Sequence, residues 1–411
     1  MANLRNSLAR AATLLAASLG MMQAENASAR LCVDPTVAPE VPPEVRAPEL
    51  RPVVDAMERD AKALSEVFTS SLAQEFLGQV GKLQEPGSTK LYISADRSVA
   101  LSERAWAEAL AKGDRFEDVS PRSFPAPFYY NTMYGSPLVF GRLLDVASMH
   151  GARSHRKVPG SASDPPASRE PAPDGAAPSG SGSLRGLRVM DFGCGTIGHL
   201  RLIALASGDA HGVDVDPILR ALYDASPDIG PIDASSPESS RVSLTIGRWP
   251  ASDEARASVG GGYDLITSKN TLKAGYIAPK PPEGQSVDPR TLIDLGVSGE
   301  GFLAAMLEAL KPGGLVVIYN ISPAQNPAKY IPWADGGSPW TREQYERAGF
   351  QVLALDVSDD AVLHAAWEAL KYDEGKGKDG LGGVVMSLYT VLRRPEQNEA
   401  PNDIQNEALG K

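Results

Sequence analysis

Apolar residues recur along this chain with two different spacings, one typical of strands and one typical of helices. Residues 187–190 form a short apolar run that predicts a strand ending at Asp191. From His199 the apolar residues are spaced for one face of a helix, and residues 210–213 form a second short run that Asp214 closes. The order strand, helix, strand predicts a βαβ unit at this point of the chain.

Further apolar runs toward the C-terminus predict more strands. They cover residues 241–246, 263–267, 315–319, 349–352 and 384–392. Residues 301–310 and 341–348 have helical spacing, and Thr341 is a suitable N-cap for the second of these helices. Strands that alternate with helices in this way are typical of a mostly parallel sheet.

The N-terminal part of the chain has a helical pattern of its own. Apolar residues recur at steps of three, four or seven over residues 53–83, which predicts one long amphipathic helix there. Residues 91–93 predict a short strand, and a helix is expected from an N-cap at Ser102 to Gly113. We therefore expect residues 30–120 to form a leader followed by a helical addition.

One internal segment has a composition that does not support a core. Residues 152–183 are dominated by Pro, Gly, Ser and Ala, lack aromatic residues, and contain Val158 as their one larger aliphatic residue. Such a segment cannot bury enough apolar surface to offset the entropy lost on ordering. We predict a disordered insertion here, within one functional unit, and a loose polar tail over residues 395–411.

The first 29 residues have the three parts of an export signal in the right order. Arg5 and Arg10 supply a positive start, residues 11–22 are apolar, and residues 27–29 (Ala-Ser-Ala) fit a small-residue cleavage site. The apolar run is too short to span a membrane, so the mature chain is expected to have no membrane span. This pattern favours a periplasmic or secreted protein. The alternative is an alanine-rich amphipathic helix on a cytoplasmic protein.

Composition narrows the class of partner. The chain has 411 residues, of which 42% are hydrophobic, enough for one large domain with additions or for two domains. A formal net charge of −11 argues against a nucleic-acid partner, which would favour a basic surface. The two cysteines, Cys32 and Cys194, and the scattered histidines do not have the spacing of a metal site. No metal is therefore predicted.

Glycines at the end of the first predicted strand point to a nucleotide-like ligand. Gly193, Gly195 and Gly198 follow Asp191 closely, and Asp214 comes about twenty residues after the first of them, the spacing of a ribose contact. Glycines allow a tight turn and a close approach of ligand to backbone. Dinucleotide binding and a purely structural turn remain alternatives, because glycines also close ordinary βα connections.

Three separated motifs resemble those of class I S-adenosylmethionine (SAM)-dependent methyltransferases. Residues 191–195 (DFGCG) are similar to the first motif of that family, and residues 263–273 (YDLITSKNTLK) to its fourth strand and the loop that follows. Residues 310–314 (LKPGG), ahead of an apolar run, resemble the turn before its fifth strand. The resemblance implies a Rossmann-like α/β fold over residues 121–394, with a seven-stranded, mostly parallel sheet flanked by helices.

By this resemblance the cofactor is SAM, and Asp214 binds its ribose hydroxyls. The other residues expected at the cofactor are Asp191, Gly193, Cys194, Gly195, Trp249 and Ser268. A carboxylate at Asp191 would repel a pyrophosphate but suit the cationic SAM, which favours SAM over a dinucleotide. The family's acid after the third strand is missing, and Trp249 is expected either to stack on the adenine or to pack in the core.

The implied activity is methyl transfer to a small molecule. An in-line displacement needs alignment and sometimes a base, and the candidate groups are Lys269, Asn270 and Tyr134, with capping or solvent exposure preferred for His199. Tyr129, Tyr130 and Tyr134 are candidates for a lid or for packing on the sheet. The alternative function is an exported, non-catalytic protein that retains the fold.

Overall fold

The structure is a computed structural model of the chain. It describes residues 52–83, 89–116, 118–124, 137–152, 182–195, 197–224, 229–232, 240–326, 328–371 and 385–396. The predicted export signal, most of the insertion, most of the polar tail and the three tyrosines at positions 129, 130 and 134 lie outside the described residues. Among the residues that are described, no helix has the length and apolar character needed to cross a membrane.

A mostly parallel sheet forms the centre of the molecule, in the order β10-β11-β9-β8-β4-β5-β7-β6. The strands are β4 (Arg188–Phe192), β5 (Asp209–Asp214), β6 (Gly230–Pro231), β7 (Arg241–Ile246), β8 (Tyr263–Lys269), β9 (Leu310–Pro323), β10 (Gln351–Ser358) and β11 (Val385–Arg393). β11 runs antiparallel to both of its neighbours, β9 and β10. The expected seven-stranded fold is confirmed, with the two-residue β6 as an unforeseen eighth strand at the edge.

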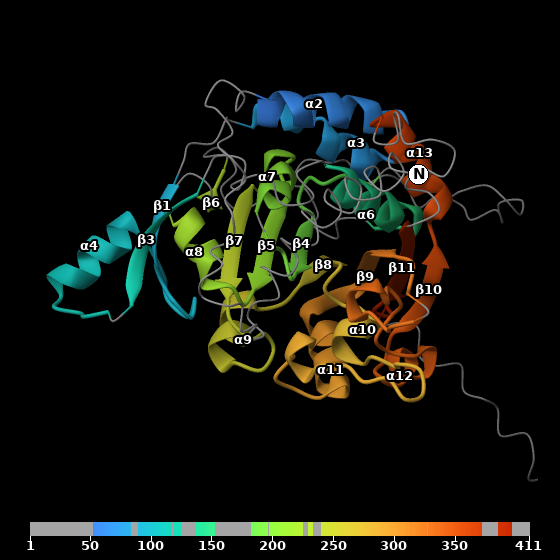
Figure 1. Cartoon of the computed structure of the whole chain (residues 1–411). Helices are drawn as coiled ribbons and strands as arrows, with labels where there is room; N and C mark the ends of the chain where they lie inside the picture. Colours follow the sequence, from blue (N-terminus) through green and yellow to red (C-terminus); the bar gives the residue numbers. More distant parts are fainter. Residues whose placement is uncertain are drawn as a thin grey trace, which may run out of the picture.

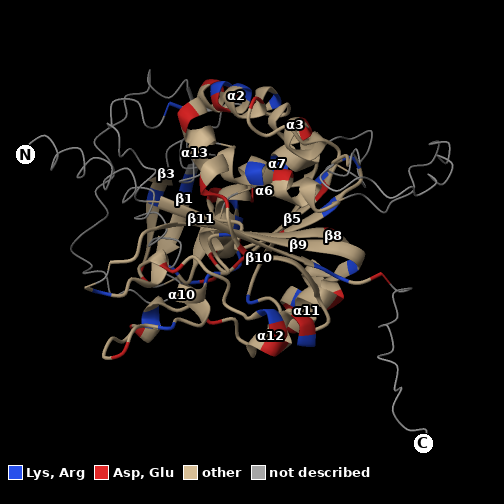
Figure 2. Cartoon of the chain, turned by 90° about the vertical axis from the view of Figure 1, so that its right-hand side faces the viewer, with Lys and Arg blue, Asp and Glu red and all other residues tan. Residues whose placement is uncertain are grey.

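Helices cover both faces of this sheet (Figure 1). One face carries α6 (Leu138–Met149), α7 (Gly198–Leu205), α8 (Pro217–Tyr223) and α13 (Asp360–Ala369); the other carries α9 (Asp253–Val259), α11 (Gly299–Ala309) and α12 (Arg342–Arg347). Adjacent strand residues face opposite layers: Val189 and Leu265 pack in the first, Met190 and Ile266 in the second. In Figure 2 the ribbon positions of charged residues are frequent on outer helices such as α2, α11 and α12, while the central strands are largely tan.

The N-terminal helical region differs from the single helix that its pattern predicts. The structure has α2 (Pro52–Ser65), α3 (Ser71–Leu77) and a 3-10 turn, η3 (Val80–Lys82), so that prediction is wrong. Ser70 caps α3 by accepting from Ala73 N, and Gln74 Nε2 donates to the carbonyls of Ser65 and Phe68 where α2 ends. The apolar stripe survives the break because both helices turn their buried residues toward the α6 layer.

The N-terminal addition is not wholly helical. It also contains a small antiparallel sheet in the order β2-β1-β3, with β1 (Thr89–Ser94), β2 (Ala100–Ser102), β3 (Val119–Phe124) and the helix α4 (Glu103–Ala111). The predicted N-cap at Ser102 is confirmed, since its hydroxyl accepts from Ala105 N. Ser102 and Arg104 both bond Asp224, at the end of α8, and so fasten this small sheet beside the βαβ unit (Figure 1).

Candidate functional site

The turn between β4 and α7, here called the glycine turn (residues 193–195), lies at the carboxyl edge of the sheet. Gly193 and Gly195 have φ angles of 72° and 66°, a left-handed conformation that favours glycine. A Cβ on Gly193 would also lie only 2.2 Å from Thr271 Oγ1. The backbone N–H groups of Gly193 and Cys194 donate to Val213 O at 2.8 and 3.2 Å. Both glycines are therefore required by the local geometry of the turn.

Asp214 ends β5 directly beside the glycine turn. Its Oδ2 accepts from Gly195 N at 3.0 Å, and its Oδ1 accepts from the N–H groups of Val215 (2.7 Å) and Asp216 (3.1 Å). Burial raises the pKa of Asp214, and these backbone hydrogen bonds oppose the rise. The residue is half-buried, and its carboxylate is held in place by three backbone N–H groups.

Asp191 lies beneath the glycine turn and is fully buried. Its Oδ1 accepts from Thr267 Oγ1 at 2.7 Å, and its Oδ2 is 2.7 Å from His199 Nε2. His199 is neither a cap nor exposed, contrary to the preference from sequence, because its ring also packs on Phe140 at 4.4 Å between centroids. Both carboxylate oxygens of Asp191 are thus engaged inside the protein, one with β8 and one with α7.

Ser268, Lys269 and Asn270 end β8 at the same edge. Lys269 is 6% exposed, and its Nζ donates to Cys194 O at 3.1 Å. Asn270 has a φ of 58°, and its Oδ1 accepts from Ile321 N at 2.7 Å. Ser268 Oγ is buried without a hydrogen-bond partner among the described residues. Of these three predicted residues, Lys269 contacts the glycine turn directly, whereas Asn270 is bonded to β9.

Trp249 follows β7, the strand that pairs with β5 on the side away from β4. Its ring packs against Phe192 (6.1 Å between centroids) and Phe302 (5.7 Å), and it is 4% exposed. These contacts are those expected if Trp249 packs in the core. Stacking on an adenine stays a prediction. The neighbouring Arg248 points to Asp294 at 2.7 Å.

Sequence reasoning missed Lys273, in the loop after β8. This lysine is fully buried, and its Nζ donates to Ile321 O at 2.7 Å. Burial lowers its pKa to about 7, against the opposing charge of Asp335. The polar residues around Lys273 do not predict its burial, because only the folded structure shows that this loop lies against β9, where Lys273 bonds Ile321 O.

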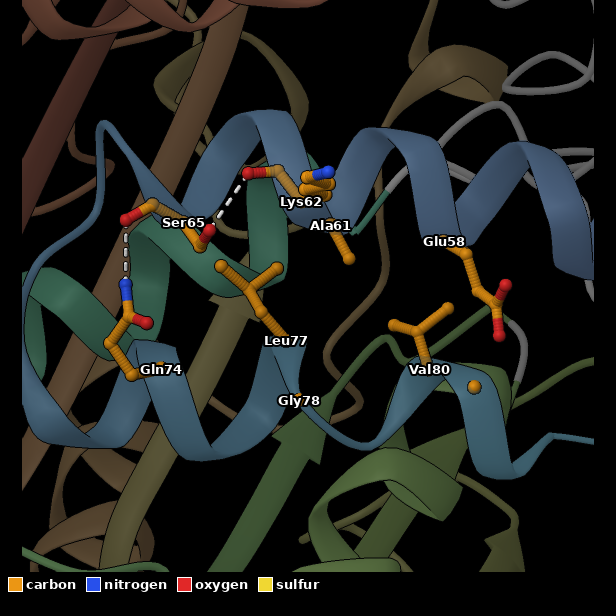
Figure 3. Close-up of a pocket in the computed structure, with 9 residues that line it drawn as sticks. Glu58, Ala61, Lys62, Ser65, Gln74, Leu77, Gly78 and Val80 are labelled. Carbon is orange, nitrogen blue, oxygen red and sulfur yellow. Dashed lines mark hydrogen bonds between the residues drawn. The ribbon is translucent and has the colours of Figure 1, made fainter.

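A separate pocket of about 290 Å³ lies on the N-terminal layer, between α2 and α3. Figure 3 shows Leu77 and Val80 pointing from the lower segment toward α2, with Glu58 and Lys62 at the rim. None of the residues predicted to bind the cofactor lines it. The candidate site is therefore the carboxyl edge of the sheet.

Comparison with known proteins finds similarity at the level of structure. No protein-family model matches the chain, and no curated protein does. Phosphoethanolamine N-methyltransferase 2 of Haemonchus contortus, solved with SAM, is 13% identical with a TM-score of 0.34 over 68% of this chain and 63% of that chain. Geranyl diphosphate C-methyltransferase of Streptomyces coelicolor A3(2) is 12% identical, with a TM-score of 0.29 over 51% and 72%. The [4+2]-cyclase SpnF is 15% identical, with a TM-score of 0.31 over 52% and 76%.

Scores at this level carry no argument about activity, and one of these three proteins is a cyclase. The order of the strands is more informative. β4 lies between β5 and β8, the point where the chain reverses direction across the sheet, and the glycine turn follows β4 directly. With β11 inserted antiparallel between β9 and β10, the topology is that of a Rossmann-like, mostly parallel α/β sheet, the fold class expected from the sequence.

Proposed function

We propose that this chain is a SAM-dependent methyltransferase with a small-molecule acceptor. The observation that carries the proposal is the hydrogen bond from Gly195 N to Asp214 Oδ2. It joins the glycine turn after β4 to the acid after β5, at the switch point where open α/β sheets bind their ligands.

The residues at this edge fit SAM. The carboxylate of Asp214 is oriented by three backbone N–H groups, and two oxygens fixed in this way suit the two hydroxyls of a ribose. The glycine turn offers backbone without Cβ atoms, and the unpartnered hydroxyl of Ser268 lies at the end of the neighbouring strand. SAM, when bound, supplies a methyl group already activated by its sulfonium.

Asp191 by itself does not give the site an electrostatic preference for SAM. Its carboxylate is paired with Thr267 and His199, and the cation of Lys269 is close enough to act on His199. Burial and that cation lower the pKa of His199, so the imidazole is neutral near pH 7. The acid and the lysine offset each other beneath the turn, and discrimination between SAM and a dinucleotide falls to experiment.

The acidic composition of the chain supports a small molecule as the acceptor in this proposal. A formal net charge of −11 does not favour nucleic acid. Of the candidate groups, Lys269 and Asn270 bond backbone atoms, and Tyr134 lies outside the described residues. The acceptor attacks a methyl carbon that the sulfonium of SAM already activates, so the reaction needs alignment above all and the proposal requires no dedicated base.

Calorimetric titration of the full chain with SAM and with NADH separates the candidate functions. Binding of SAM but not of NADH supports the proposal, and transfer of a labelled methyl group to an acceptor pool then establishes catalysis. Binding of NADH alone indicates an oxidoreductase. Absence of SAM binding at millimolar concentration leaves a retained scaffold and overturns the enzyme assignment.

A further inference from the structure

The glycine turn is held from two neighbouring strands at once. From β5, Val213 O accepts the N–H groups of Gly193 and Cys194. From β8, Lys269 Nζ donates to Cys194 O at 3.1 Å. The backbone of residue 194 is therefore bonded on its N–H side by one strand and on its carbonyl side by the other, and its side chain is buried.

The end of β8 also packs against the turn. Thr271 occupies the space that a Cβ of Gly193 would need, and its Oγ1 is 3.4 Å from Gly193 O. Lys269 precedes it and is 6% exposed, so its long side chain runs inside the protein toward the turn. Both side chains thus contact the turn from the carboxyl end of β8.

The ammonium group of Lys269 is opposite in charge to the buried carboxylate of Asp191. Asp191 is fully buried under the turn and is bonded by Thr267 and His199, neither of which brings a positive charge at neutral pH. A carboxylate buried without a cation nearby is costly. The ammonium of Lys269 acts on the same His199 ring, so it supplies the cation of this cluster.

We propose that Lys269 is a positioning residue, which holds the glycine turn in its ligand-binding shape through Cys194 O and does not act as the base on the acceptor. The inference rests on the proposed function for the identity of the ligand only. A base would need an amine free to reach the acceptor, whereas the Lys269 amine is directed at the backbone of the turn.

The test compares Lys269→Met with Lys311→Met in a Cys32→Ser background, where Cys194 is the one remaining thiol. Lys311 is the matched control because it also pairs with a buried group of β8, Asp264, but at the other end of the strand.

Three quantities are measured: the rate at which a thiol reagent labels Cys194, the SAM dissociation constant, and the NMR titration midpoint of His199, assigned with His199→Gln. The first and third need no cofactor.

Lys269→Met should label Cys194 about tenfold faster than the parent, since local opening of the turn exposes the thiol. It should also raise the His199 midpoint, because the remaining charge beside the ring is that of Asp191. SAM affinity should fall about tenfold with the lost charged hydrogen bond. Lys311→Met, compared at equal residual stability, should change none of the three.

Parent-like labelling and an unchanged His199 midpoint in Lys269→Met overturn the proposal. So does a variant that keeps full SAM affinity and loses only methyl transfer, because that is the behaviour of a base. If the parent protein binds no SAM, the proposed function fails, yet the labelling and titration still decide whether Lys269 holds the turn.

Discussion

The two ends of β8 show how one buried strand serves two purposes. At its amino end Asp264 has no exposed side-chain surface, and Lys311 Nζ donates to its Oδ1 at 2.6 Å. At its carboxyl end Lys269 donates to a backbone carbonyl, Ser268 Oγ has no partner among the described residues, and Asn270 has a left-handed φ. The amino end, with its ion pair between side chains, is here called the closed end of β8, and the carboxyl end is called the open end.

The difference lies in how the polar groups are satisfied, since every residue of β8 is buried. Polar groups at the amino end bond each other and Arg188 N, which serves only stability. Polar groups at the carboxyl end bond the backbone of the glycine turn and of β9, and Ser268 Oγ has no hydrogen-bond partner among the described residues. Incomplete satisfaction of buried groups is typical of functional sites.

The largest effect is expected at the closed end. Asp264→Ala should lower the free energy of unfolding by about 3 kcal/mol, because it breaks a buried pair and leaves Arg188 N without its acceptor. SAM affinity should stay the same wherever the variant is folded. Urea unfolding and calorimetry measure the two quantities, and a loss of SAM affinity in the folded variant would erase the distinction between the two ends.

A pH dependence should come from the buried histidine next to the start of β8. His211 Nε2 is 2.8 Å from Thr245 Oγ1 and its Nδ1 is 3.1 Å from Tyr263 Oη, and burial lowers its pKa from 6.5 to about 4. The unfolded chain therefore binds the proton first, so stability is complete above pH 6.5 and is lost as the pH falls toward 4.

The expected loss from His211 is about 3 kcal/mol between neutral pH and pH 4. The free energy of unfolding, measured with urea at each pH over this range, should depend less steeply on pH for His211→Gln than for the parent. The same pH dependence in the two proteins would mean that His211 is not the group that titrates.

At the open end, Asp214→Ala should weaken SAM binding at least about tenfold, because charged hydrogen bonds contribute about 1.5–3 kcal/mol. The variant should also lose about 1 kcal/mol of stability, because three backbone N–H groups lose their acceptor, so the affinity is compared where each variant is folded. Asp216→Ala is the matched control: it removes the cap that bonds Ile218 N and should cost about 1 kcal/mol of stability with unchanged affinity. Equal affinities for parent and Asp214→Ala would remove Asp214 from the site.

The smallest effect is expected from a change that touches neither end. Replacement of residues 153–181 by a short Gly-Ser link should shift the melting temperature by less than about 3 °C, because loop-closure entropy varies slowly with length. The ends to be joined lie together, since a Cβ on Gly182 would be 2.7 Å from Ala152 O. A fall of many degrees would show that the segment contributes to packing.

The sequence predicts the sheet well because its strands appear as short apolar runs, and the central strands β4 and β8 are buried over nearly their whole length. The span 241–246 coincides with β7, and the expected strand at 263–267 is the larger part of β8. The break between α2 and α3 is not predictable in the same way. The apolar stripe continues through it, and only the capping by Ser70 and Gln74 reveals the change of direction.

The site is predictable as a set of positions but not as a set of contacts. The glycine turn and Asp214 are adjacent because successive strands of a βαβ unit bring their carboxyl ends together. The pairing of Asp191 with His199, and of Lys269 with Cys194 O, depends on side-chain directions across three elements. No spacing in the chain encodes those directions.

Amide hydrogen exchange of the full chain with and without SAM tests most directly where the ligand binds. SAM should slow exchange at Gly195 and Val215, whose N–H groups bond Asp214, and should leave the amino end of β8 around Asp264 unchanged. Slowing confined to the pocket between α2 and α3, or no slowing at any amide at millimolar SAM, would contradict the assignment of the carboxyl edge as the cofactor site.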